Sequence, residues 1–333
     1  MSPQYVNHGA DLSYPTPLMC EGTTLYGFIL EGQLPNLLNL CQRAFYEPSG
    51  GQVYYYPLSR FFMLTVGYIQ KIYSMSFNCG WTPEAQAIVW IPTAVVKPSG
   101  SKLIAERLAW FPAYTIVSNP YSLVSGREVI GFFKGFGWID VPEGGDVINP
   151  ARLSADVFGI KDFAPQSSAQ RYPLFELTRL SGADGQAGNQ WPTLEAAFND
   201  LKAQLVNAGP DPVVPSLELG LNLIDDLLHK EVPLAFLKQF RNAAGDGGVS
   251  YQAILELPAT VQHFRGIQLI DAYQFTLLNN LASYPLATDL GVASQKALLS
   301  FKLEMDFTIG DGAEIWNAAP VQRPGCLGFL FGK

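Results

Sequence analysis

Charged side chains are scarce in this sequence: they make up 15% of its 333 residues, whereas 48% of the residues are apolar. A disordered chain needs the opposite balance, so the composition predicts a folded protein with a large apolar core. Basic residues are scarcer than acidic ones, 21 against 29, and they form no cluster. We therefore expect no nucleic-acid partner, because binding to phosphates requires grouped lysines and arginines.

Long apolar runs are missing as well. No uninterrupted stretch approaches the roughly 20 apolar residues of a membrane-spanning helix, so we expect no membrane partner. The first residues, MSPQYVNHGADLSYPTP, have neither the basic region nor the apolar region of a signal peptide. These absences predict a cytoplasmic protein.

Cysteine and histidine are few and widely spaced. The four cysteines are Cys20, Cys41, Cys79 and Cys326, and the three histidines are His8, His229 and His263. No two cysteines form a CxxC pair, so the spacing suits a reduced protein better than a disulfide scaffold or a zinc site. We expect neither a metal nor a cofactor.

Apolar periodicity predicts a chain rich in β-strands. The ranges with strand-like composition are 23–30, 53–56, 61–76, 85–96, 114–117, 126–133, 175–180, 251–256, 266–278 and 298–309. A short helix is predicted from Pro35 to about Pro48, where apolar residues recur at helical spacing. Helical patterns also fill 193–206 and 217–230. The glycines at 182, 185 and 188 precede no helix directly and follow no strand, so they indicate a linker and not a phosphate loop.

Residues 126–136 (GREVIGFFKGF) carry the clearest chemical signal. They place Lys134 at the end of a strongly apolar segment, between aromatic side chains. Such surroundings favour the neutral amine over the ammonium, and a neutral amine is what forms an imine with a ketone or aldehyde. The alternative is an edge-strand lysine whose head reaches water across an aromatic surface.

The same segment resembles the glycine-arginine-glutamate signature of the acetoacetate decarboxylase family, in which the Schiff-base lysine follows the glycine by eight positions. Lys134 follows Gly126 by eight positions. Residues 81–88 (WTPEAQAI) resemble the glutamate-bearing strand of that family, which makes Glu84 the matching carboxylate. The resemblance implies that Lys134 and Glu84 are the catalytic pair.

Further segments follow the family in collinear order, and they cover most of the chain outside about 180–232. The remaining matches are 25–45, 237–240, 251–256, 266–269, 284–290, 305–307 and 314–316. The resemblance therefore implies a divergent family member with a β-rich α+β fold, in which an antiparallel barrel-like core forms one domain over 1–333. The helical segment 181–232 would be an insertion, acting as a lid, an oligomer contact or a packing appendage.

Three positions depart from the family pattern. Gly135 stands where the family has a second lysine, and Glu31 stands near the place of its substrate-facing arginine. Residues 61–66 hold no carboxylate where a second family glutamate belongs. Decarboxylation of acetoacetate itself is therefore not expected.

The resemblance still implies imine chemistry on a small oxo compound or oxo acid, as in a decarboxylase, an aldolase or a dehydratase. Glu84 would be the general acid and base. The expected pocket consists of Phe132, Phe133, Phe136, Trp138, Arg127 and Glu128, where an ion pair between the last two is the favoured interpretation. Family habit implies a homo-oligomer. The second hypothesis is a non-catalytic ligand-binding or scaffold protein that has retained the fold.

Overall fold

The computed structural model describes residues 4–6, 13–99, 102–181, 190–191 and 231–318. The strands are β1 (Leu18–Glu31), β2 (Tyr55–Pro57), β3 (Phe61–Ser74), β4 (Thr82–Ser99), β5 (Lys102–Val117), β6 (Lys134–Asp140), β7 (Arg152–Gly159), β8 (Gln170–Arg179), β9 (Gln190–Trp191), β10 (Glu231–Arg241), β11 (Val249–Leu269), β12 (Tyr273–Leu277), β13 (Gln295–Lys296), β14 (Leu299–Ile309) and β15 (Ala313–Asn317). The helices are α1 (Leu34–Cys41), α2 (Pro120–Ser125) and α5 (Leu286–Leu290), with π-helical turns at Gln42–Tyr46 and Gly126–Ile130.

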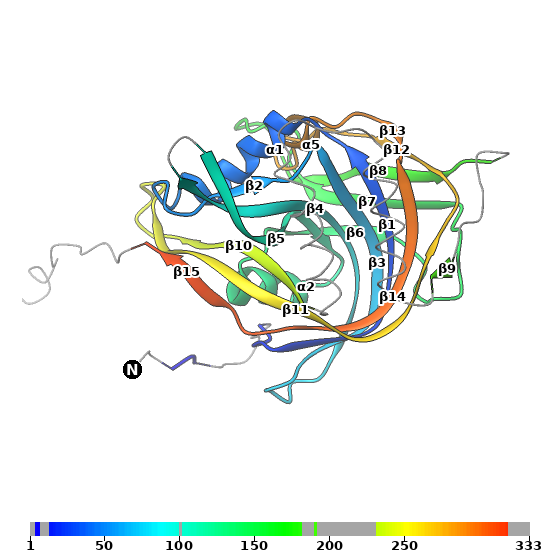
Figure 1. Ribbon diagram of the computed structural model, residues 1–333, viewed down its shortest axis with the longest axis horizontal. Helices are drawn as coiled ribbons and strands as arrows, with labels where there is room; N and C mark the ends of the chain where they lie inside the picture. Colours follow the sequence, from blue (N-terminus) through cyan, green and yellow to red (C-terminus); the bar gives the residue numbers. More distant parts are fainter. Residues whose placement is uncertain (1–3, 7–12, 100–101, 182–189, 192–230, 319–333) are drawn as a thin grey trace, which may run out of the picture.

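The strands join into one large, strongly curved sheet (Figure 1). Its hydrogen-bonded order is β13-β12-β8-β7-β6-β5-β10-β11-β14-β1-β3-β4-β2, β5 also pairs with β4, and β9 and β15 pair with β11. The expectation of a β-rich chain is thus confirmed. The expectation of antiparallel pairing fails at two places, since β5 runs parallel to β6 and to β10. Between β5 and β6 the chain crosses over through α2, and a crossover connection permits a parallel pair.

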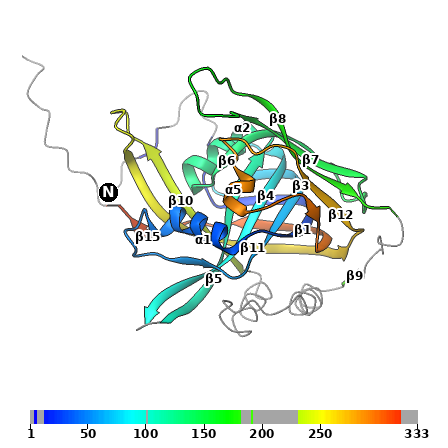
Figure 2. The same ribbon diagram turned by 90° about the horizontal axis from the view of Figure 1, so that it is seen from above.

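The main core lies on one face of the long strands. Three fully buried side chains alternate along β1, namely Tyr26, Phe28 and Leu30. They belong to the same core as Phe45, in the π-helical turn that follows α1, and Phe111 of β5. A bulge between residues 20 and 23 shifts the register of β1, so its two ends contribute side chains of different parity to a face. Figure 2 shows the far end of the β4–β5 hairpin projecting from the rest of the molecule.

The segment before Lys134 is helical, so the predicted strand over 126–133 is wrong. Asn119 caps α2 by accepting hydrogen bonds from the main-chain N–H groups of Tyr121 and Ser122, and Pro120 occupies the first turn. The helix continues as the π-helical turn until Gly131, whose φ of +94° ends it. Lys134 therefore begins β6, whereas the sequence pattern placed it at the end of a strand.

The predicted helix over 35–48 is confirmed as α1 and the π-helical turn that follows it. It lies beside α5 (Figure 1), to which Asn36 donates a side-chain hydrogen bond at the carbonyl of Thr288. The predicted helices of the insertion, 193–206 and 217–230, and its predicted linker glycines at 182, 185 and 188 lie outside the described residues. Within 181–232 the structure describes residue 181, the pair Gln190–Trp191, which pairs with β11, and residues 231–232 at the start of β10. Of the helices that the structure describes, none combines the length and the apolarity needed to cross a membrane.

Candidate functional site

Lys134 places its amine in a buried polar cluster. The residue pairs with Thr115 of β5 at the start of β6, and one-tenth of its side chain is exposed. Its Nζ donates a hydrogen bond of 2.5 Å to Ser122 Oγ of α2 and lies 5.1 Å from the centre of the Phe132 ring. The lysine is therefore not the solvated edge-strand lysine that the sequence left open.

Glu84 of β4 faces the same amine. Its Oε1 lies 3.9 Å from Lys134 Nζ, and 1% of its side chain is exposed. Burial raises the pKa of the Glu84 carboxyl, while the nearby Lys134 and a hydrogen bond with Ser122 offset only part of this rise. Its second oxygen, Oε2, is buried without a hydrogen-bond partner among the residues described. This carboxyl can therefore exchange a proton with a group placed beside the amine.

Gly126 explains why a glycine precedes the lysine by eight positions. A Cβ at residue 126 would lie 2.5 Å from Cδ and 2.7 Å from Cε of Lys134. The aliphatic part of the lysine thus crosses directly over the helix at this glycine. A larger residue would displace the chain that carries the amine.

Asn119 ties α2 to β4 and so fixes the distance between Ser122 and Glu84. While its Oδ1 caps the helix, its Nδ2 donates hydrogen bonds to Thr82 Oγ1 and to the carbonyl of Pro83, the latter at 2.6 Å. One side chain therefore connects the start of the helix with the strand residues that precede Glu84.

Three of the six expected pocket residues lie near Lys134 and the others lie elsewhere. The Phe132 ring is 5.1 Å from Lys134 Nζ and packs into an apolar cluster, whereas Arg127 and Phe133 line a cavity that Lys134 also borders. The ring centres of Phe136 and Trp138 lie 5.1 Å apart in an edge-to-face contact. The guanidinium of Arg171 lies over the exposed ring of Trp138. The expectation of one aromatic wall is wrong because successive residues of an extended chain point to opposite sides.

The expected ion pair between Arg127 and Glu128 is also wrong. In the described part of the chain no salt bridge joins the two, and both residues are exposed. Arg127 Nη1 instead donates a hydrogen bond of 3.2 Å to the main-chain carbonyl of Lys134. Neighbouring residues on a helical turn point in different directions, so they do not face each other.

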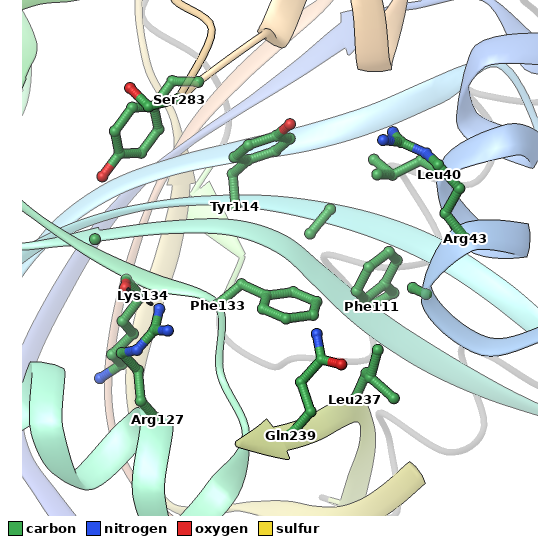
Figure 3. A pocket seen from close by; sticks show the side chains of 14 residues that line it. Leu40, Arg43, Phe111, Tyr114, Arg127, Phe133, Lys134, Leu237, Gln239 and Ser283 are labelled. Atoms are coloured by element: carbon green, nitrogen blue, oxygen red, sulfur yellow. Dashed lines mark hydrogen bonds between the residues drawn. The ribbon is translucent and has the colours of Figure 1, made fainter. Parts of the chain in front are cut away.

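The cavity that Phe133 lines has a volume of about 370 Å³. Its walls come from α1, β5, β6, β10 and the segment around Tyr284 (Figure 3). Arg127 and Gln239 lie on one side of it, and Tyr114 lies on the other. Figure 3 shows the Nζ of Lys134 turned away from this space, in agreement with its hydrogen bond to α2.

The position of the absent second lysine is filled by a tyrosine. A Cβ on Gly135 would come within 1.7 Å of the Tyr284 hydroxyl oxygen. No side chain fits at residue 135 while Tyr284 keeps this position. Burial raises the pKa of Tyr284, and Arg127 partly opposes that rise.

The other two positions that differ from the family pattern, Glu31 and the segment 61–66, make local contacts within the sheet region. Glu31 forms a 2.8 Å ion pair with Arg60, and 45% of its side chain is exposed. In the strand segment 61–66, Thr65 Oγ1 accepts a hydrogen bond of 2.9 Å from Trp90 Nε1. Residue 31 therefore carries a negative charge that is paired with Arg60, and residues 61–66 contain no carboxylate.

Sequence reasoning missed Ser122 and Cys20. The Asn-Pro pair at 119–120 is a helix-start signal that could have placed Ser122 in a first turn. Burial, with Glu84 nearby, raises the pKa of the Cys20 thiol, which keeps it uncharged. No local sequence pattern indicates Cys20, because pairing between distant strands of the sheet brings β1 close to Glu84 and Lys134.

Comparisons with known proteins agree with this architecture. An acetoacetate decarboxylase from Legionella pneumophila superposes with a TM-score of 0.57 at 12% identity, covering 95% of this chain and 92% of that one. The chain has the acetoacetate decarboxylase-like fold. The enduracididine biosynthesis enzyme MppR, solved with pyruvate, gives a TM-score of 0.54 at 13% identity over 92% of this chain and 93% of its own.

An acetoacetate decarboxylase-like enzyme from Sphingomonas wittichii also shares the fold, with a TM-score of 0.51 at 13% identity over 96% of this chain and all of its own. No protein-family model matches the sequence. No curated protein matches it either. The likeness is therefore one of fold, at identities too low to assign an activity.

Proposed function

We propose that this protein is a divergent member of the acetoacetate decarboxylase family that forms a Schiff base between Lys134 and a small oxo acid. The observation that carries the proposal is the burial of Lys134 Nζ between Ser122 Oγ, at 2.5 Å, and Glu84 Oε1, at 3.9 Å. A buried amine beside a buried proton donor is the arrangement that imine formation needs.

The three side chains have separate roles in the proposed reaction. The neutral amine of Lys134 attacks the carbonyl carbon. The carbonyl oxygen leaves as water after taking one proton from the attacking nitrogen and one from the protonated Glu84, which becomes a carboxylate. The resulting iminium accepts the electron pair released when a bond next to the former carbonyl carbon breaks. Ser122 accepts a hydrogen bond from the amine and directs it before attack. Because burial raises the pKa of Glu84, its protonated form persists to a higher pH than in water.

An oxo acid other than acetoacetate is the proposed substrate class. Gly135 and Glu31 replace two cations of the decarboxylase pattern, and Glu31 is already paired with Arg60. The fold relative MppR was solved with pyruvate bound, which makes pyruvate the first probe. We further propose the barrel-like core and the homo-oligomeric assembly that the family resemblance implies.

Borohydride trapping tests the proposal. The protein is incubated with pyruvate, acetoacetate or a longer 2-oxo acid, reduced, and weighed by intact-mass spectrometry. A single covalent adduct is expected in the wild type and none in Lys134→Ala. Glu84→Gln is expected to form the same adduct at least ten-fold more slowly, a loss typical of a general acid. Absence of any adduct with every oxo acid at neutral pH would refute the proposal.

The second candidate is a non-catalytic ligand-binding protein with the same fold. The observation that favours it is the tyrosine that fills the site of the second lysine and so departs from the enzyme pattern. Under this alternative an oxo acid binds reversibly, and borohydride leaves the mass of the protein unchanged.

A further inference from the structure

The cavity that Phe133 lines contains one guanidinium, that of Arg127, with no anionic partner among the described residues. Arg43 is neutralised by Asp289 at 2.6 Å, and Asp289 also accepts a 2.6 Å hydrogen bond from the Tyr114 hydroxyl. Lys134 also lines the cavity, but its amine is turned away toward Ser122 and Glu84. Arg127 lines the cavity, yet no carboxylate of the described chain pairs with it.

The donors of this cavity are suited to an anion. Arg127 uses one N–H on the Lys134 carbonyl, and a guanidinium carries five N–H groups in a planar fork that matches a carboxylate. Gln239 accepts a 3.0 Å hydrogen bond at Oε1 from Gln252. Its amide nitrogen is thereby directed toward the Phe133 ring and the cavity (Figure 3). The guanidinium of Arg127 and the amide nitrogen of Gln239 thus lie on either side of the Phe133 ring, and both can donate hydrogen bonds to a ligand.

The lining also has a large apolar part, formed by Leu40, Phe111, Phe133 and Leu237, and three hydroxyl groups, those of Tyr114, Ser283 and Tyr284. The volume of about 370 Å³ lies within the range of small-molecule pockets. An apolar enclosure with a few convergent polar groups holds an amphipathic molecule. A purely ionic ligand such as phosphate would leave these walls without a partner.

We propose that this cavity binds an organic monocarboxylate with an aromatic or alkyl body, whose carboxylate pairs with Arg127. Lys134 borders both this cavity and the proposed Schiff-base centre, but its amine is turned toward Ser122 and Glu84, and Glu84 does not line the cavity. The ligand keeps all its covalent bonds on binding. The inference therefore goes beyond the proposed function and does not depend on it.

Titration calorimetry with 3-phenylpropionate tests the site. This acid has no ketone or aldehyde, so it cannot form an imine, and its amide, 3-phenylpropanamide, is the neutral control of nearly the same shape. The wild type is expected to bind the acid at least roughly ten-fold more tightly than the amide, the range for a charge-assisted pair. Arg127→Gln is expected to remove this preference, and Arg127→Lys to retain part of it.

Glu84→Gln is the matched control on the other side of β6. It is expected to slow imine trapping while leaving the affinity for 3-phenylpropionate unchanged. Equal affinity of the wild type for acid and amide, no binding of the acid, or unchanged binding in Arg127→Gln would each overturn the proposal. Loss of binding in Glu84→Gln with retention in Arg127→Gln would place the anion at the lysine and overturn it too. Melting temperatures confirm that each variant is folded.

Discussion

Replacing Gly126 by alanine is expected to displace the Lys134 amine without unfolding the protein. Gly126 has φ −61°, which alanine adopts readily, and alanine in a helix is favoured over glycine by about 0.5–1 kcal/mol. The new Cβ, however, would lie 2.5 Å from Lys134 Cδ, whereas carbon atoms rest at roughly 3.5–4.0 Å. The lysine chain must therefore shift by about 1 Å or more.

Such a shift breaks the 2.5 Å hydrogen bond between Nζ and Ser122 and moves the amine relative to Glu84. A displacement of about 1 Å can cost roughly 100-fold in rate. We therefore expect borohydride trapping of an oxo acid to slow by about that factor, while the melting temperature stays level or rises.

Gly144→Ala provides the matched control, because a Cβ there would meet no atom within 4 Å. It should trap the oxo acid at the wild-type rate. If Gly126→Ala also traps at the wild-type rate, the position of the lysine chain over the glycine has no bearing on the chemistry, and the explanation of the eight-residue spacing is refuted.

Three further predictions concern the surroundings of the lysine. Gly135→Ala should lower the free energy of unfolding in urea by about 1–3 kcal/mol through overpacking against Tyr284, and adding Tyr284→Phe should recover part of it; no loss would contradict the contact. The free energy of unfolding of the wild type, relative to that of Glu84→Gln, should be highest below pH 4.5 and should fall as the pH rises through the pKa of Glu84 in the folded state. The reason is that the native state still holds a proton that the unfolded chain has released. Urea unfolding measured between about pH 4 and pH 8 would show the opposite slope if folding lowered this pKa. Asn119→Ala should cost about 0.5–2 kcal/mol as a lost helix cap, whereas Asn119→Asp should keep the cap, lose the donors to β4 and slow trapping; equal trapping by Asp and Asn would argue against the positioning role.

Strand composition was sufficient to predict most of the sheet. Ranges such as 61–76 and 85–96 carry dense β-branched and aromatic residues, and they form β3 and β4 with ends moved by a few residues. The short helix α1 followed from Pro35 and the apolar spacing. The closeness of Lys134 and Glu84 followed only from the family resemblance, since they are distant in sequence.

Residues 126–133 show where composition fails. Their valine, isoleucine and phenylalanine favour a strand, but a capped helix start at Asn119 and a left-handed stop at Gly131 decide the backbone. Contacts between distant segments were equally hidden. Nothing near Gly135 in the sequence shows that Tyr284 lies against it, and no local pattern shows that Arg127 lacks an anionic partner among the described residues while Arg43 has one.

The most direct test of the central claim is to locate the reduced adduct on the chain. Lys238 is the rival amine, because burial lowers its pKa below the ordinary lysine value. It donates a 3.1 Å hydrogen bond to the carbonyl of Val129 and lies against Phe240. After trapping with pyruvate and proteolysis, peptide mass spectrometry should find the adduct on Lys134 alone, and Lys238→Met should trap as the wild type does. An adduct on Lys238, or one that persists in Lys134→Ala, would contradict the account.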